Sequence, residues 1–115
     1  MDIRAMLWQE ARSDQKRALP ILSFPASQKL GVTVEELVKS APLQAEAMAL
    51  VARETNSLAA ISFMDLSVEA ECFGANVRFS DTEVPTVIGR LIHDEEEANA
   101  LTVPEIGAGR TGIYL

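Results

Sequence analysis

Cysteine and histidine are almost absent from this chain of 115 residues, which contains only Cys72 and His93. A single cysteine cannot form an internal disulfide, so we expect a cytoplasmic protein in a reducing compartment. One histidine and one cysteine are also too few for a zinc site made of those side chains alone. Carboxylates can also bind metals, but their spacing here indicates no such site, and we predict no metal ligands.

Basic clusters and long apolar runs are missing as well. The chain has 10 Lys and Arg residues against 17 Asp and Glu residues, a formal net charge of −7 at pH 7. Such a surface repels phosphate groups, so we expect no nucleic-acid partner. No apolar run approaches the roughly 20 residues needed to span a bilayer, and the N-terminus lacks the order of a secretory signal. We therefore expect no membrane partner either.

The apolar content, 48% of the residues, is sufficient for the core of one domain or of part of one. Turn residues and hydrophobic periodicity divide the chain into three parts. We expect an N-terminal helix within residues 1–18, an α/β portion in residues 19–102, and a glycine-rich tail or linker in residues 103–115.

Helices are predicted where apolar spacing coincides with capping residues. Residues 2–17 carry an apolar stripe at helical spacing, made of Ile3, Met6, Leu7 and Ala11, with Trp8 beside it, where it can pack on the edge of the stripe. Thr33 is the expected N-cap of a second helix. Further helices are predicted after Ser40-Ala41-Pro42 as far as about Thr55, from Ser67 to Phe73 before Gly74, and from Glu95 to Leu101 after the cap Asp94.

Two segments, Leu19–Phe24 and Leu58–Met64, are apolar at nearly every position, as in parallel strands that helices cover on both faces. Two shorter segments, Asn76–Phe79 and Val84–Ile88, are predicted to form an antiparallel excursion with Pro85 at an edge. This order of helices and strands predicts an α/β fold. Because two parallel strands are not a stable sheet, their edges need cover from the excursion, from a second copy of the chain, or from further sequence.

Asp65 is the first candidate for a functional side chain, because it directly follows the predicted strand 58–64. A carboxylate in that position can point into a pocket, bind cationic or N–H groups, or move a proton. It can equally cap the helix that follows, and Ser67 is an alternative cap. The sequence leaves these interpretations open.

Glu69 is the second candidate, since it approaches Asp65 if the helix begins at Asp65. Two close carboxylates would suit acid–base chemistry, although a solvent-exposed helix face is the commoner explanation. Glu69 and Glu71 lie on different helix faces, so they cannot both join Asp65 in one carboxylate cluster. Cys72 is predicted to be a small buried apolar residue and His93 a surface residue.

Several motifs resemble the uroporphyrinogen decarboxylase superfamily. The most specific runs from Phe63 to Gly74 and includes Phe-Met-Asp-Leu-Ser-Val-Glu-Ala-Glu and then Phe-Gly. Supporting matches are Val84-Pro85-Thr86-Val87, Val103-Pro104 and Gly109-Arg110-Thr111, so the similarity extends from about Arg17 to Leu115. The resemblance implies a (β/α)8 TIM barrel of roughly 250 residues. Residues 19–102 would then be its N-terminal portion, the first β/α units.

The resemblance also implies residue roles. Asp65 matches the aspartate that the decarboxylases place at the bottom of the active-site cleft, against the pyrrole N–H groups of the substrate. Their arginine-rich motif, which holds substrate carboxylates, is replaced here by Ser23 to Gln28. The Val-Glu-Ala-Glu sequence at 68–71 is more similar to the corrinoid-dependent methylcobamide:thiol methyltransferases, in which zinc activates a thiol. Their zinc ligands, a His-x-Cys pair and a later cysteine, belong to the second half of the barrel.

We therefore expect the N-terminal segment of such a methyltransferase, inactive alone, with Asp65 and then Glu69 as its site residues. Zinc and a methyl-corrinoid partner protein are implied only for the complete enzyme. The alternative is a non-catalytic interaction module that forms a homodimer or complements a separate C-terminal barrel segment. Unpaired strand edges favour this alternative, because they recruit other strands.

Overall fold

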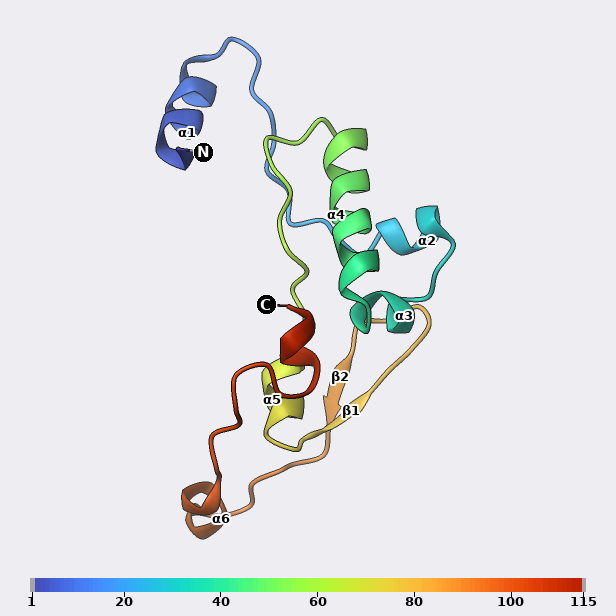
Figure 1. The fold of residues 1–115 in the computed structure, drawn as a ribbon, viewed down its shortest axis with the longest axis vertical. Helices are drawn as coiled ribbons and strands as arrows, with labels where there is room; N and C mark the ends of the chain where they lie inside the picture. Colours follow the sequence, from blue (N-terminus) through green and yellow to red (C-terminus); the bar gives the residue numbers. More distant parts are fainter. Residues whose placement is uncertain (1, 115) are drawn as a thin grey trace.

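The computed structural model describes residues 2–114, which form an elongated body of 57 × 33 × 20 Å (Figure 1). Its helices are α1 (Ile3–Arg12), α2 (Ala26–Leu30), α3 (Val34–Val38), α4 (Ala41–Glu54), α5 (Val68–Cys72), α6 (Glu95–Ala100) and the 3-10 helix η1 (Gly109–Ile113). The strands of the described residues are β1 (Asn76–Arg78) and β2 (Thr86–Ile88). The radius of gyration is 17.7 Å, whereas a compact domain of this length has about 13 Å. The body is therefore not closed on itself.

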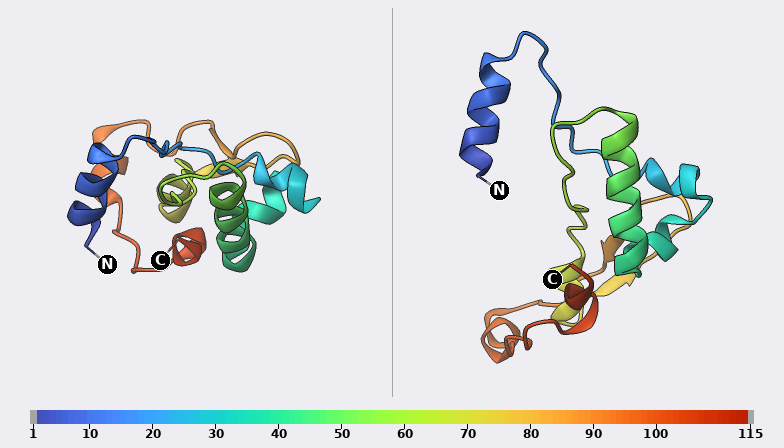
Figure 2. Two further views of the ribbon diagram at one scale, coloured as in Figure 1. Left: turned by 90° about the horizontal axis from the view of Figure 1, so that it is seen from above. Right: turned by 45° about the horizontal axis from the view of Figure 1, so that its top comes forward.

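The apolar core lies where α2, α3 and α4 meet the extended segment that leads to α5 (Figure 2). Its buried members are Ala26, Leu37, Ala47, Val51 and Phe63. The rings of Phe24 and Phe63 meet edge to face with their centroids 5.3 Å apart, an arrangement that aromatic pairs prefer. This contact joins the extended segments 19–24 and 58–64, and it fixes the position from which α5 begins.

The predicted starts of three helices are confirmed. Thr33 and Glu36 form a capping box at α3, in which the Thr33 hydroxyl accepts from the Glu36 N–H at 3.0 Å and the Glu36 carboxylate accepts from the Thr33 N–H at 2.8 Å. The side chains of Ser40 and Asp94 cap α4 and α6 in the same local manner. Each cap satisfies backbone donors that have no partner within the helix.

The antiparallel excursion is also confirmed. β1 and β2 pair so that Val77 lies opposite Val87, and Arg78 lies opposite Thr86. Gly74, at the predicted end of the preceding helix, has φ +101°, a conformation that glycine adopts without steric cost. The hairpin therefore follows α5 directly and turns the chain back toward α3.

The prediction of two parallel core strands is wrong for residues 2–114, whose one sheet is the pair β1–β2. Segments 19–24 and 58–64 are largely extended but form no ladder. One backbone hydrogen bond joins these regions, from the N–H of Leu58 to the carbonyl oxygen of Ala18 at 2.9 Å. The physical reason is that two isolated strands gain too little from pairing to form a sheet. Residues 2–114 therefore form a body of helices and one two-stranded antiparallel sheet, which is consistent with part of a barrel.

α1 is shorter than predicted, and its apolar face is exposed. It ends at Arg12, since Ser13 is extended, and the Nζ of Lys16 donates to three carbonyl oxygens at this end, at 2.6 to 3.2 Å. Its apolar stripe is solvent-exposed, with Ile3 61% and Leu7 47% exposed. Figure 1 shows α1 projecting away from the rest of the body, so the stripe has no core to pack against.

The C-terminal segment is not the linker that its glycines predicted. Residues 109–113 form η1, which packs against α5. A Cβ atom at Gly112 would lie 2.8 Å from the carbonyl oxygen of Gly107, closer than real Cβ atoms approach. Glycine at 112 therefore permits the close backbone approach that folds the chain back onto α5.

Candidate functional site

Asp65 lies at the junction between the extended segment and α5, with its residue 8% exposed. Its Oδ1 accepts hydrogen bonds from the Ser67 backbone N–H at 2.9 Å and from the Ser67 hydroxyl at 2.6 Å. This is the local pattern of an Asx turn. The helix begins after Ser67, whose hydroxyl makes no capping bond to α5. Asp65 thus orders the turn before α5 and does not act as its N-cap.

Arg110, from η1, completes the surroundings of Asp65. Its Nη1 donates to Oδ2 of Asp65 at 2.5 Å, its Nε donates to Oε2 of Glu71 at 2.5 Å, and its Nη2 donates to Oγ of Ser67 at 2.9 Å. The guanidinium also stacks on the ring of Phe79, with Cζ 4.8 Å from the ring centroid. Arg110 therefore connects the C-terminal segment to both ends of α5 and to Phe79, which directly follows β1.

Burial and charge oppose each other in this cluster. Burial alone would raise the pKa of Asp65, but hydrogen bonds from Ser67 and Arg110 outweigh it and lower the pKa below its ordinary value. Burial alone would lower the pKa of Arg110, whereas its bonds to Asp65 and Glu71 raise that pKa. Both groups are therefore ionised at neutral pH.

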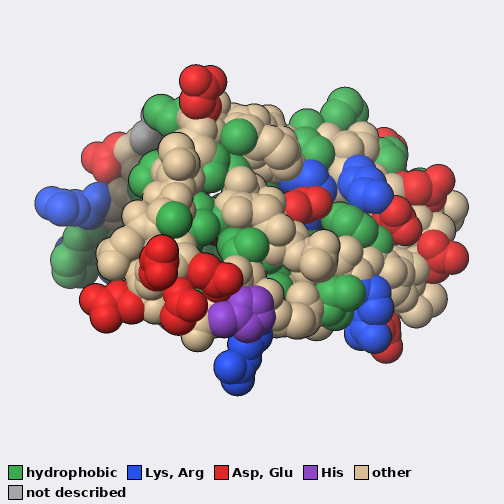
Figure 3. All heavy atoms as spheres, turned by 90° about the horizontal axis from the view of Figure 1, so that it is seen from below, with side chains coloured by type: hydrophobic (Ala, Val, Ile, Leu, Met, Phe, Trp, Pro, Cys, Tyr) green, Lys and Arg blue, Asp and Glu red, His purple; other side chains and the backbone are tan. Residues whose placement is uncertain are grey.

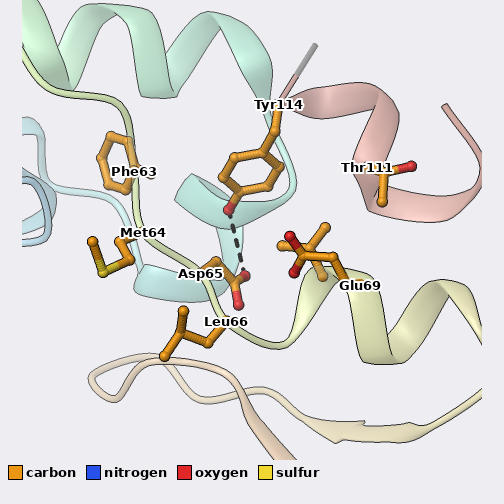
Figure 4. Close-up of a pocket in the computed structure, with 8 residues that line it drawn as sticks. Phe63, Met64, Asp65, Leu66, Glu69, Thr111 and Tyr114 are labelled. Atoms are coloured by element: carbon orange, nitrogen blue, oxygen red, sulfur yellow. Dashed lines mark hydrogen bonds between the residues drawn. The ribbon is translucent and has the colours of Figure 1, made fainter. Parts of the chain in front are cut away.

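Tyr114 approaches the same carboxylate from the end of the described chain. Its hydroxyl donates to Oδ2 of Asp65 at 3.4 Å (Figure 4). Burial first, and then the negative charge of Asp65, raise the pKa of Tyr114 to about 12. The phenol is therefore protonated at neutral pH and serves as a donor to Asp65.

A cavity of about 310 Å³ opens beside these groups. It is lined by Phe63, Met64, Asp65, Leu66, Val68, Glu69, Thr111 and Tyr114. Figure 4 shows the carboxylate of Glu69 pointing toward Asp65 and Tyr114 across this space. The cavity is thus mainly apolar, with one arginine-paired carboxylate and one exposed carboxylate in its wall.

The site brings together some of the predicted residues and adds others. Asp65 and Glu69 both line the cavity, but the carboxylate that joins Asp65 in binding Arg110 is that of Glu71. His93 is at the surface as predicted, with Nδ1 3.0 Å from Oε2 of Glu97. Arg110 and Tyr114 were not predicted, because their segment contains three glycines and was interpreted as a linker. The motif Gly109-Arg110-Thr111 was the available signal.

The hydrogen bonds that Asp65 accepts limit its basicity and therefore the kind of ligand that the cavity can bind. Asp65 receives four donors, so it is a weak base and its charge is neutralised by Arg110. Glu69 carries the exposed carboxylate, which can bind an ammonium or an N–H group at the cavity mouth. The arrangement therefore suits an apolar ligand with a cationic or N–H group better than it suits an anion.

The described residues offer no resident metal centre. In residues 2–114 no group of three or more His, Cys, Asp or Glu side chains is placed to hold a metal ion. Cys72, half-buried on α5, has a free thiol. In the same residues, no helix combines the length and apolar character needed to cross a membrane.

Comparison with known proteins identifies the family. The model of the uroporphyrinogen decarboxylase (URO-D) family matches residues 18–115. The chain therefore belongs to the uroporphyrinogen decarboxylase family, and the barrel implied by that family is consistent with the partial α/β body seen here. No curated protein and no solved structure matches the chain. The family match begins after α1, so α1 lies outside it.

Proposed function

We propose that this chain is the N-terminal part of a corrinoid- and zinc-dependent methyltransferase of the family and that it is inactive alone. The observation that carries the proposal is the position of Asp65, buried after the extended segment and in the wall of the cavity. The Val-Glu-Ala-Glu sequence at 68–71 favours the methyltransferase branch over the decarboxylases. The missing arginine-rich motif at 23–28 favours it as well.

The described side chains do not fit zinc. Asp65 is engaged by Arg110, and neither Cys72 nor His93 belongs to a cluster of candidate ligands. We therefore assign the zinc ligands to a C-terminal barrel segment and derive no step through the metal. The contribution of this chain is to bind and orient the substrate. Asp65, Arg110 and Glu71 hold the cavity wall rigid, and Glu69 presents a carboxylate to a cationic or N–H group.

A complementation assay tests this proposal. The purified chain is mixed with the C-terminal segment of a family methyltransferase that carries the His-x-Cys ligands. Zinc, methylcobalamin and 2-mercaptoethanol are added, and demethylation of the corrinoid is followed by its absorbance. We expect turnover in the mixture and none with either part alone.

The assay has two outcomes that contradict the proposal. One is a stable complex of the two parts, detected by light scattering, without methyl transfer. The other is decarboxylation of uroporphyrinogen by that complex, which would assign the chain to the decarboxylase branch. Glu46→Gln, at an exposed position of α4 outside the cavity lining, serves as the control for a Glu69→Gln variant in the same assay.

A second candidate function is a non-catalytic module that associates with itself. The observation that favours it is the open shape of the body, whose radius of gyration of 17.7 Å exceeds the value of about 13 Å for a compact domain. Light scattering at several concentrations tests it. A dimer that persists on dilution supports the module, and a monomer at every concentration contradicts it.

A further inference from the structure

α1 and the residues that follow it form a self-contained arm, residues 2–17. Lys16 caps the C-terminal end of α1 through its carbonyl oxygens, and the carboxylate of Glu10 binds the guanidinium of Arg17 at 2.9 Å. No residue of α1 is buried. The arm is therefore held in shape by its own contacts while its apolar side chains face solvent.

The exposed face of the arm has the composition of a binding surface. Trp8 is 60% exposed, and the guanidinium of Arg12 stacks on its ring at 5.4 Å. Ile3 and Leu7 lie one helical turn apart beside this pair. Tryptophan and arginine are the residues most enriched where binding energy concentrates in protein interfaces. A stripe of this kind normally packs against an apolar surface.

The body carries a matching apolar groove at its opposite end. A cavity of about 320 Å³ between α5, β2 and α6 is lined by apolar side chains, among them Ala70, Phe73, Val87, Leu91, Ile92 and Leu101. The chain between two of the lining residues, Ile92 and Leu101, contains α6, whose first turn carries Glu95, Glu96 and Glu97. Figure 3 shows acidic side chains gathered beside the one histidine of the chain, which precedes α6.

Charge distinguishes the arm from the rest of the chain. Residues 2–17 contain four basic and three acidic side chains, whereas residues 18–115 contain six basic and fourteen acidic ones. Arg4 and Arg12 of the arm thus complement the acidic first turn of α6. Complementary charges at an interface increase association rates and select the correct partner.

The positions of the two surfaces allow reciprocal pairing. Figure 1 shows α1 and α6 near opposite ends of the long axis, and Figure 2 shows them on the same side of the body when it is viewed down that axis. A two-fold axis that passes through this side, between the two ends of the long axis, places α1 of each copy against α6 of the other. Such an interface is self-complementary, as closed dimers require.

We propose that a second copy of this chain is the partner, and that α1 of each copy binds the apolar groove between α5, β2 and α6 of the other. The proposal rests on the second candidate function, self-association, and names its surface. The accessible surface is 8164 Å², about 2,000 Å² more than a compact monomer of 12.5 kDa exposes. A stable interface needs only about 800 Å² from each partner.

Trp8 supplies a direct readout, because it is the one tryptophan of the chain. On dilution of the full chain, we expect a dimer-to-monomer transition by light scattering together with a red shift of tryptophan emission. Leu7→Glu places a charge in the apolar contact and raises the dissociation constant by at least about 100-fold. Arg53→Glu, an exposed change on α4, leaves it unchanged, and circular dichroism verifies the fold of each variant.

A charge exchange tests the orientation. One variant carries Arg4→Glu with Arg12→Glu, and the other carries Glu96→Arg with Glu97→Arg. Each variant alone places like charges opposite each other at both contacts. Its dissociation constant therefore rises by about 10-fold or more. An equimolar mixture restores opposite charges at both contacts and restores the dimer.

The outcomes separate this inference from the function on which it rests. A wild-type monomer at every concentration overturns both self-association and the proposed surface. A dimer that persists in Leu7→Glu and is not changed by the charge exchange overturns the surface and leaves self-association standing. Methyl transfer by the complemented enzyme does not depend on either result.

Discussion

Nη1 of Arg110 lies 2.5 Å from Oδ2 of Asp65, a residue 45 positions earlier in the chain. This ion pair connects the C-terminal 3-10 helix to the start of α5, and both side chains are at most 8% exposed. Glu71 and Ser67 bind the remaining donors of the guanidinium. The candidate site and the folded state of the tail therefore depend on the same interaction.

Asp65→Asn removes the negative charge that faces Arg110. We expect the free energy of unfolding to fall by about 3 kcal/mol, because a buried guanidinium then has only Glu71 as an ionic partner. Urea denaturation measures the change. Glu69→Gln, in the same cavity wall but exposed, is the matched control and changes stability by less than about 0.5 kcal/mol. Equal losses in the two variants would contradict the role assigned to the ion pair.

Acid weakens the same interaction. The pKa of Asp65 is lower in the folded chain than its ordinary value of 3.8, so its stabilisation is complete above that value. It is lost as the pH falls below 3.8 and through the folded-state pKa, because the unfolded state binds the proton more readily. Urea denaturation at a series of acidic pH values measures this loss. In Asp65→Asn the corresponding part of the pH dependence disappears, and its persistence would show that other carboxylates cause it.

Tyr114 is the one tyrosine of the chain, so its titration can be followed directly by absorbance. We expect a pKa of about 12, against 10.0 ordinarily. The stability contributed by the protonated phenol is complete below pH 10 and is lost as the pH rises through 12. Asp65→Asn lowers the pKa, because the negative charge of Asp65 contributes to the shift. An ordinary value in the folded chain would mean that Tyr114 is not buried beside Asp65.

Arg110→Lys tests whether the tail is held by geometry or by charge alone. Lysine keeps the positive charge but lacks the planar fork that reaches Asp65, Glu71 and Ser67 together. We expect amide hydrogen exchange in residues 109–113 to accelerate by at least about 10-fold, since the anchoring contacts are lost and the segment opens locally. Arg90→Lys, on an exposed loop, is the control. Unchanged exchange in Arg110→Lys would show that charge alone is sufficient.

The sequence determined the elements that depend on neighbouring residues. The caps Thr33 and Asp94 predict the starts of α3 and α6, and Pro42 predicts the start of α4, because these signals act on backbone only a few positions away. The hairpin of β1 and β2 was recognised for a similar reason, since its strands are close in sequence. Asp65 was found as a site residue from a motif and from its position after an apolar segment.

Tertiary structure decided the contacts between distant residues. Glycine frequency indicated a linker at 103–115, yet Arg110 is buried there because Asp65 and Glu71 compensate the cost of removing its charge from water. The spacing of Ile3 and Leu7 predicts a helix with an apolar face, yet both side chains are exposed because no other element of the described residues covers them. Local sequence specifies which faces are apolar and which side chains can cap. Only the folded chain decides what those faces and charges meet, because the free energy of burial depends on partners that are far apart in sequence.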